Sequence, residues 1–171
     1  SAVSKKVGFQ YSTENFNISG DRYLAAGGDP NRQTIPVIHD EEIVKLREYD
    51  AIYLGAERFN ARDDGAQLTL DELEQACRLA HARGARIYLT FNVLLKPAEL
   101  RDALLHLGDC IDRGIDAAIV QDLGAVRLIQ AAYPDLEIHG STQMTVHDPA
   151  GARVLQAMGV ERGVLARENA L

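Results

Sequence analysis

Hydrophobic and polar positions alternate in a regular order from residue 51 onward. Short apolar runs rich in β-branched residues, typical of buried strands, occur at 51–55, 86–92, 116–122, 137–140 and 163–166. Segments with apolar residues at helical spacing lie between them. Strands that alternate with helices through short connections favour parallel pairing and right-handed crossovers. The pattern therefore predicts an α/β fold of parallel (β/α) units, with five strands and four intervening helices.

Several helix starts carry recognisable signals. Thr69 and Glu72 have the spacing of a capping box at the start of the first helix in this region. Pro97 is expected in the first turn of the next helix, because proline is well tolerated there. Asp148 and Pro149 together predict an N-cap and a first turn for the last helix.

The first 50 residues follow a different pattern. Two strand candidates, VGFQY and TIPVI, flank a polar, glycine-rich stretch without clear periodicity, and a helix is expected over residues 40–49. The polar stretch has two readings, a long functional loop or lid and a disordered or locally non-native segment. We therefore divide a single domain into a divergent N-terminal segment, residues 1–50, and a (β/α) portion, residues 51–171.

Length and charge limit the class of protein. The chain has 171 residues and a mass of 18.7 kDa, which suits one domain but falls short of the roughly 200 to 250 residues of a full eight-unit barrel. A net charge of −7 argues against a broad electrostatic grip on nucleic acid, although it leaves room for one basic groove. Without a long apolar run or a signal-peptide pattern, we expect a cytoplasmic protein that does not contact a membrane.

The two cysteines do not signal a disulfide framework or a zinc site. Cys77 and Cys110 fall on predicted helices and lack the CxxC spacing of metal sites. We expect both to be buried small apolar residues. Patterns for phosphate loops, dinucleotide binding, HExxH zinc sites and EF-hands are also absent from the sequence.

Polar side chains gather where the predicted strands end, and ligands bind at the carboxyl ends of strands in parallel α/β folds. Arg58, Asn60 and Arg62 lie in the loop after the first strand. Two arginines are able to hold a phosphate or a carboxylate, and an asparagine is able to fix a carbonyl or amide group. A solvated loop with a local Glu–Arg pair is the alternative interpretation.

The next two strands also end in polar residues. Asn92 follows the second strand, and Gln121 and Asp122 follow the third. Because parallel strands end at the same edge of a sheet, these three side chains are expected to converge at a substrate-binding site. Asp122 has a second interpretation, as the N-cap of the following helix.

The segment STQMTVH, after the fourth strand, extends this candidate site. Ser141 and Gln143 are expected to bind substrate, and Arg167 follows the fifth strand. His139 and His147 have no identifiable partner in the sequence, so a Ser–His–Asp catalytic set cannot be argued from spacing. Hydrogen bonding to a ligand, or helix capping, is therefore favoured over nucleophilic catalysis, and no catalytic residue or metal ligand is assigned.

Four segments resemble a known family, the U32 peptidases, also called collagenase-like proteases. They are AIYLGAERFNAR, LTLDELEQACRLAHARGARIYLTFN, IDAAIVQDLGAVRLIQAAYPDLEIHGSTQMTVH and GVLAREN, and the resemblance covers about residues 50–171. It implies a partial or truncated TIM-barrel-like fold. The family carries a peptidase (hydrolase) label, but its better-understood members resemble hydroxylation factors, oxygen-independent or prephenate-linked, that act on transfer RNA, ribosomal RNA or a quinone ring.

The sequence departs from the family pattern at both ends. The usual opening strand with its L-A-P-A-G turn is not found in residues 1–50. The resemblance implies an iron–sulfur cluster in full-length members, with four cysteines after the segment that here reads LAREN, and the sequence ends at Leu171 before them. We therefore expect no cofactor in this chain and an incomplete active site in the isolated chain.

Three functions follow as hypotheses. The first is a portion of a U32-family enzyme that hydroxylates RNA or a small aromatic substrate. The second is peptide hydrolysis, as the family label states. The third is a non-catalytic half-barrel or rearranged α/β scaffold, for which exposed strand edges of an open barrel predict a homodimer.

Overall fold

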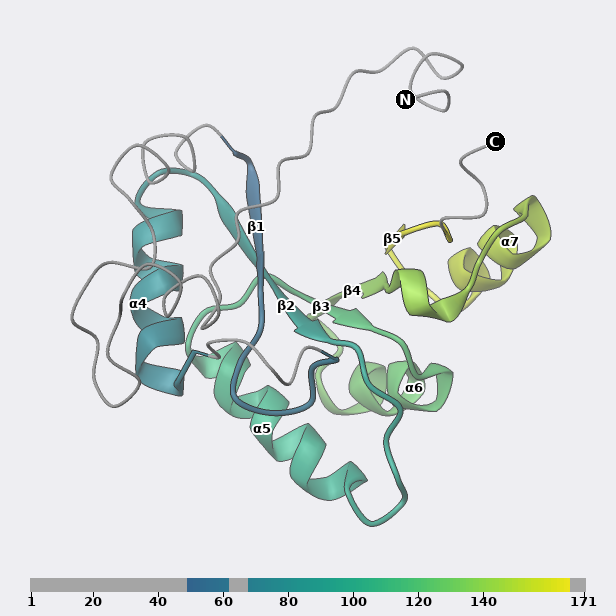
Figure 1. The fold of residues 1–171 in the computed structure, drawn as a ribbon, viewed down its shortest axis with the longest axis horizontal. Coiled ribbons are helices and arrows are strands. Elements are labelled where there is room, and N and C mark those ends of the chain that lie inside the picture. Colours follow the sequence, from purple (N-terminus) through teal and green to yellow (C-terminus); the bar gives the residue numbers. More distant parts are fainter. Residues whose placement is uncertain (1–48, 62–67, 167–171) are drawn as a thin grey trace, which may run out of the picture.

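The computed structural model describes residues 49–61 and 68–166. Its strands form one sheet in which every neighbouring pair is parallel and the spatial order follows the sequence (Figure 1). This arrangement confirms the predicted α/β class and its parallel (β/α) units. The strands are β1 (Ala51–Leu54), β2 (Arg86–Phe91), β3 (Ala117–Val120), β4 (Glu137–Gly140) and β5 (Arg162–Gly163).

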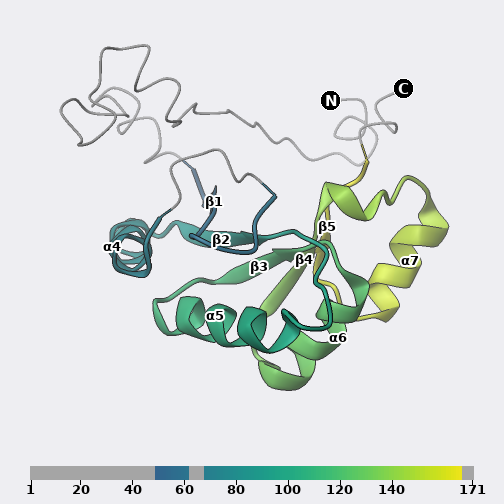
Figure 2. The ribbon, with the colours of Figure 1, turned by 60° about the horizontal axis from the view of Figure 1, so that its bottom comes forward.

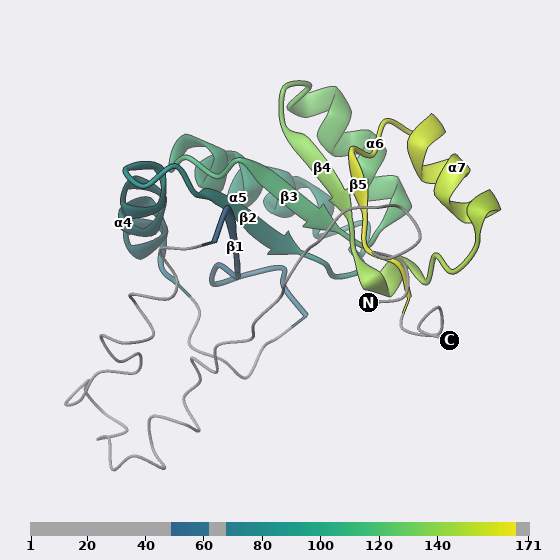
Figure 3. The ribbon, with the colours of Figure 1, turned by 90° about the horizontal axis from the view of Figure 1, so that it is seen from above.

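A helix connects each strand to the next, as expected for right-handed parallel crossovers. Figure 2 shows α5 and α6 beneath the sheet, and Figure 3 shows all four α-helices behind or beside it. In the described part of the chain no α-helix covers the opposite face, which we call the helix-free face. The helices are α4 (Leu70–His81), α5 (Leu100–Asp112), α6 (Leu123–Ala132), the short 3₁₀ helix η1 (Thr142–Met144) and α7 (Pro149–Ala157).

Two of the predicted helix starts are confirmed. The Thr69 hydroxyl accepts a hydrogen bond from the Glu72 backbone N–H, and the Glu72 carboxylate accepts one from the Thr69 N–H at 2.8 Å, which completes the capping box of α4. Asp148 caps α7 by accepting a hydrogen bond from Gly151 N at 2.7 Å, and Pro149 occupies the first helical position.

The predicted position of Pro97 is wrong. Helix α5 begins at Leu100, and Pro97 lies in the turn before it. The Glu99 backbone N–H donates to the Lys96 carbonyl at 2.8 Å, and the Lys96 N–H donates to the Glu99 carboxylate at 2.9 Å. These two bonds close the turn around Pro97, so the helix starts after it.

The last strand also differs from the prediction, which placed it at 163–166. Strand β5 covers only Arg162–Gly163, because the chain leaves the sheet after Val164. The Val164 N–H still donates to the Gly140 carbonyl, but the Ala166 N–H donates to Val146, which lies in the segment between η1 and α7. The strand candidates and the helix expected within residues 1–49 lie almost entirely outside the described residues.

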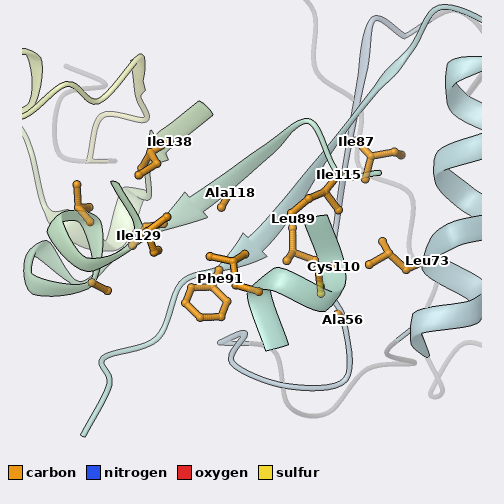
Figure 4. Packing of buried hydrophobic residues seen from close by; sticks show 14 of the residues in the cluster. Ala56, Leu73, Ile87, Leu89, Phe91, Cys110, Ile115, Ala118, Ile129 and Ile138 are labelled. Atoms are coloured by element: carbon orange, nitrogen blue, oxygen red, sulfur yellow. The ribbon is translucent and has the colours of Figure 1, made fainter. Parts of the chain in front are cut away.

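The main hydrophobic core lies between the sheet and the helices. Side chains alternate along β2, so Ile87, Leu89 and Phe91 pack toward Leu73 of α4 and Leu107 of α5, and all five are at most 1% exposed (Figure 4). Tyr88 points to the helix-free face, where it packs in a separate, smaller cluster with β3 residues. Of the helices in the described ranges, none combines the length and the apolar character needed to cross a bilayer.

Both cysteines are buried in the main core, as predicted. Burial, together with the nearby carboxylate of Asp116, raises the pKa of the Cys77 thiol to about 11, and burial with the carboxylate of Asp109 raises that of the Cys110 thiol to about 12. Both side chains are therefore neutral thiols near pH 7 and pack as small apolar residues.

Candidate functional site

The sheet register brings three of the predicted substrate-binding residues side by side. Phe91 pairs with Val120, and Val120 pairs with Gly140, so the residues that follow each strand, Asn92, Gln121 and Ser141, lie at the same edge of the sheet. We call these three residues the strand-end rim. The Ser141 N–H donates to the Val120 carbonyl at 2.8 Å, which extends the pairing of β3 and β4 into the rim.

The rim residues share the helix-free face of the sheet. Each lies two positions beyond a residue of that face, namely Thr90, Ile119 and His139, and side chains of a strand repeat every second residue. One edge of the sheet thus carries two amides and a hydroxyl, groups that form hydrogen bonds rather than act as a nucleophile with a base.

Asn92 holds the loop after β1 in place. Its side-chain oxygen accepts a hydrogen bond from the Ala61 backbone N–H at 3.1 Å, across 31 residues of sequence. Asn60, 8% exposed, donates from Nδ2 to the Ala56 carbonyl at 2.7 Å. Gly55 permits this fold of the loop, because a Cβ there would lie 3.1 Å from Asn60 Nδ2. The two asparagines therefore shape the loop through backbone contacts, and their predicted contact with substrate stays a prediction.

Phe59 anchors the same loop. Its backbone lies in the left-handed region, with φ of 62°, which is rare for a bulky residue and indicates that tertiary packing imposes it. The ring contacts Phe91 and His106, with centroid separations of 5.7 and 5.8 Å. The exposed Arg58 guanidinium lies 4.7 Å from the centroid of the Phe59 ring.

Asp122 is a structural residue, as its second interpretation proposed. Its Oδ1 accepts hydrogen bonds from Gly124 N at 2.8 Å and Ala125 N at 3.0 Å, which caps α6, and its Oδ2 accepts one from Leu95 N at 3.1 Å. Partial burial alone would raise the pKa of this carboxyl, but the three backbone N–H groups together outweigh it and lower the pKa. Asp122 therefore ties the loop after β2 to the start of α6.

The segment after β4 adds one buried and one exposed side chain. Ser141 is 3% exposed and its hydroxyl accepts a hydrogen bond from the Gln143 N–H at 3.2 Å, which starts η1. The Gln143 side chain is exposed beside the rim. Arg62 and Arg167, also predicted to bind substrate, lie outside the described residues.

A polar cluster that the sequence interpretation missed lies one layer below the rim on the helix-free face. The His139 Nε2 is 2.7 Å from the Glu137 Oε1, and the Glu137 Oε2 is 3.2 Å from an Arg86 guanidinium nitrogen. The His139 ring also meets Tyr88 edge to face, with 4.6 Å between centroids. The expectation that His139 lacks a partner is therefore wrong. The available signal was the Glu-x-His spacing on a strand, which places both side chains on one face.

The hydrogen bond between Asn92 and Ala61 is expected to contribute to the stability of the fold. Replacing Asn92 with alanine removes the acceptor for the Ala61 N–H, and we expect the free energy of unfolding to fall by about 1 kcal/mol, measured by urea denaturation. Asn92→Asp keeps an acceptor at the same place and is the matched control. Equal stability of wild type and Asn92→Ala would show that the contact does not hold the loop.

The two cysteines do not fit as ligands of an iron–sulfur cluster. Cluster ligands are thiolates, whereas Cys77 and Cys110 lie inside the core with strongly raised pKa values. Within residues 49–61 and 68–166, no three or more His, Cys, Asp and Glu side chains are grouped so that they would hold a metal ion. The described residues therefore do not supply a cluster site.

The fold and the rim define an α/β protein of successive parallel (β/α) units with polar side chains at the strand ends. The family model described as peptidase family U32 matches residues 42–171, and the chain belongs to this family.

Curated relatives carry two kinds of name. The chain is 35% identical over 123 residues to the 23S rRNA 5-hydroxycytidine C2501 synthase of Escherichia coli (strain K12), which covers 72% of this chain and 18% of that protein. It is 30% identical over 122 residues to tRNA hydroxylation protein P of the same organism, with 71% and 27% covered. It is also 30% identical to the uncharacterized protease MJ0090 of Methanocaldococcus jannaschii, with 71% and 29% covered. The chain spans less than two fifths of the length of each of these relatives.

A solved structure supports the fold. The U32 peptidase Mk0906 superposes with a TM-score of 0.58 over 81% of this chain and 64% of that chain, at 16% sequence identity. At this level of identity the similarity shows the fold alone.

Proposed function

We propose that this chain is the substrate-binding portion of an enzyme that hydroxylates a base of ribosomal or transfer RNA. The observation that carries the proposal is the strand-end rim, where Asn92, Gln121 and Ser141 offer hydrogen-bonding groups without a nucleophile–base pair. The names of the rRNA and tRNA hydroxylation relatives support the choice of RNA. We further propose that the sheet is a sector of a TIM-like barrel whose interior is the helix-free face, in a protein of the cytoplasm.

In this proposal the residues have different tasks. Gln121 and Asn92 orient the base through their amides, and Ser141 shapes the floor of the rim. Arg58, whose guanidinium is exposed beside the rim loop, binds a phosphate of the RNA backbone, because arginine matches phosphate geometry through paired N–H groups. Arg62 and Arg167 are proposed to assist in phosphate binding.

Analysis of modified nucleosides tests this function. In a strain that lacks the gene, we expect one nucleoside of rRNA or tRNA, heavier than its parent by the mass of an oxygen atom, to disappear from mass spectra. The wild-type gene should restore it, and the Gln121→Ala variant should restore at least tenfold less if this amide supplies a binding contact worth about 1.4 kcal/mol. Unchanged nucleosides in both RNA classes would refute RNA hydroxylation.

Peptide hydrolysis is the second candidate, favoured by the printed names of two similar proteins. Among the described residues, the cysteines are buried and His147 donates from its Nδ1 to a backbone carbonyl, so neither forms a nucleophile pair. Incubating the purified protein with denatured collagen separates the two functions. Cleavage that persists after removal of trace proteases would favour the peptidase.

A further inference from the structure

The helix-free face carries a row of aromatic and charged side chains that the proposed function has not used. Tyr53 meets Tyr88 edge to face at 5.4 Å between centroids, and Tyr88 meets His139 at 4.6 Å. The Arg162 guanidinium carbon lies 5.6 Å from the centroid of the Tyr88 ring. Ala117, between Tyr88 and Glu137 in the register, is small enough to let the rings meet across β3. The row thus crosses the sheet from β1 to β5.

One atom in this row lacks the partner that its burial requires. His139 is 1% exposed, and its Nδ1 has no hydrogen-bond partner within the described part of the chain. Buried polar atoms are almost always hydrogen-bonded, because leaving one unpaired costs the full desolvation of that group. An unpaired ring nitrogen on the face that also carries the rim therefore points to a ligand.

Glu137, the partner of His139 Nε2, determines whether Nδ1 needs a donor or an acceptor from the ligand. Glu137 Oε1 is a carboxylate oxygen, so Nε2 carries a hydrogen and donates to it across 2.7 Å. The other carboxylate oxygen, Glu137 Oε2, is 3.2 Å from an Arg86 guanidinium nitrogen. In the neutral imidazole, Nδ1 then carries a lone pair and accepts a hydrogen bond. The ligand must present an N–H or O–H group to Nδ1.

Charge determines the second property of the ligand. Arg162 lies beside His139 in the sheet register, is exposed, and has no carboxylate partner among the described residues. Its guanidinium is suited to an anionic group such as a phosphate. A molecule that carries an N–H donor on a flat ring and a phosphate elsewhere, joined to the ring through a sugar, meets both requirements.

We propose that His139 and Arg162 form a nucleotide-binding site on the helix-free face, in which His139 Nδ1 accepts a hydrogen bond from an N–H group of the base and Arg162 binds the phosphate. The proposal rests on the proposed function for the choice of a nucleotide. In this site His139 positions the base, and Glu137 keeps the His139 imidazole in the tautomer that leaves Nδ1 free of a hydrogen. The rim lies one residue layer above His139 on the same face, so its amides are within reach of the same base.

Nitrogen NMR of the full chain with cytidine 5′-monophosphate as the probe tests the site. We expect the His139 Nδ1 resonance to move on titration while the resonances of exposed His147 stay in place.

His139→Phe keeps the ring against Tyr88 but removes the acceptor, and should weaken nucleotide binding by about tenfold, the loss of one hydrogen bond. His81→Phe is the matched control, because His81 also pairs with a carboxylate, Asp116 at 2.9 Å, but on α4. It should bind as wild type does.

A second variant keeps the test decisive if His139→Phe fails to fold. Arg162→Ala alters an exposed side chain and should weaken binding of cytidine 5′-monophosphate severalfold while leaving binding of cytidine, which lacks the phosphate, unchanged. Ribose 5-phosphate should not move the Nδ1 resonance. An unmoved Nδ1 resonance at saturating nucleotide, or equal losses for both ligands in Arg162→Ala, would overturn the site.

The outcomes separate this inference from the proposed function. If the gene deletion removes a hydroxylated nucleoside but cytidine 5′-monophosphate leaves His139 unmoved, the site is wrong and RNA hydroxylation stands. If the nucleosides are unchanged but the nucleotide binds through His139, RNA hydroxylation is wrong and the nucleotide site stands.

Discussion

Replacing Leu107 with alanine is expected to lower the free energy of unfolding by about 3 to 5 kcal/mol, the largest effect of any single change considered. Leu107 is fully buried in α5, where it packs between the helix layer and the sheet. Truncation removes one methine and two methyl carbons and leaves a cavity that close-packed neighbours fill only in part. Urea denaturation of wild type and variant measures the difference.

Leu105→Ala is the matched control for this experiment. Leu105 lies two positions earlier in the same helix and is 56% exposed. The same chemical change should therefore alter the free energy of unfolding by less than about 0.5 kcal/mol. If both variants lost a similar free energy of unfolding, the Leu107 face of α5 would not be the face that packs on the sheet.

Replacing Asp122 with alanine is expected to lower the free energy of unfolding by about 2 to 3 kcal/mol. The change removes the N-cap of α6 and, in addition, the acceptor for the Leu95 N–H. Because Asp122 connects two loops that flank the rim, the loss should also weaken binding of any rim ligand. Asp135→Ala, which removes an exposed carboxylate outside the helices, is the control and should leave stability nearly unchanged.

The charge on Asp122 gives this prediction a pH dependence. Since its pKa is lower in the folded protein than in the unfolded chain, the carboxylate stabilises the fold above about pH 4 and loses this effect as the pH falls further. Asp122→Asn keeps an oxygen acceptor but does not ionise. The stability difference between wild type and Asp122→Asn should therefore be constant near pH 7 and shrink toward pH 3. A difference independent of pH would show that charge plays no part.

Local signals in the sequence were sufficient for much of the fold. Thr69 with Glu72, and Asp148 with Pro149, involve contacts within a few residues, so their spacing predicts the helix start directly. The prediction that Pro97 lies in the first helical turn was wrong, because proline suits a tight turn as well as the first turn of a helix. The turn at Pro97 depends on the Glu99 side chain, which accepts a hydrogen bond from the Lys96 N–H. The length of β5 depends on where the chain turns toward Val146, a tertiary contact that no local pattern records.

The candidate site was only partly predictable. Parallel pairing follows from the order of the elements, so the meeting of Asn92, Gln121 and Ser141 at one edge could be foreseen. The contact of Asn92 could not, because its partner, the Ala61 N–H, is 31 residues away. For Asp122 the local N-cap could be foreseen, but the bond from the Leu95 N–H, 27 residues away, could not. His139 was dismissed for want of a partner, although Glu137 stands two positions before it.

The sequential order of the strands has a consequence for how the chain reaches its native state. Successive strands begin 20 to 35 residues apart and each pairs with the one just before it, so every new pairing closes a loop of modest length. Folding is therefore able to proceed by adding one unit at a time to a growing sheet, without waiting for distant segments, as the chain emerges from the ribosome. In such an order of folding, the earliest strands provide the template on which the later ones assemble.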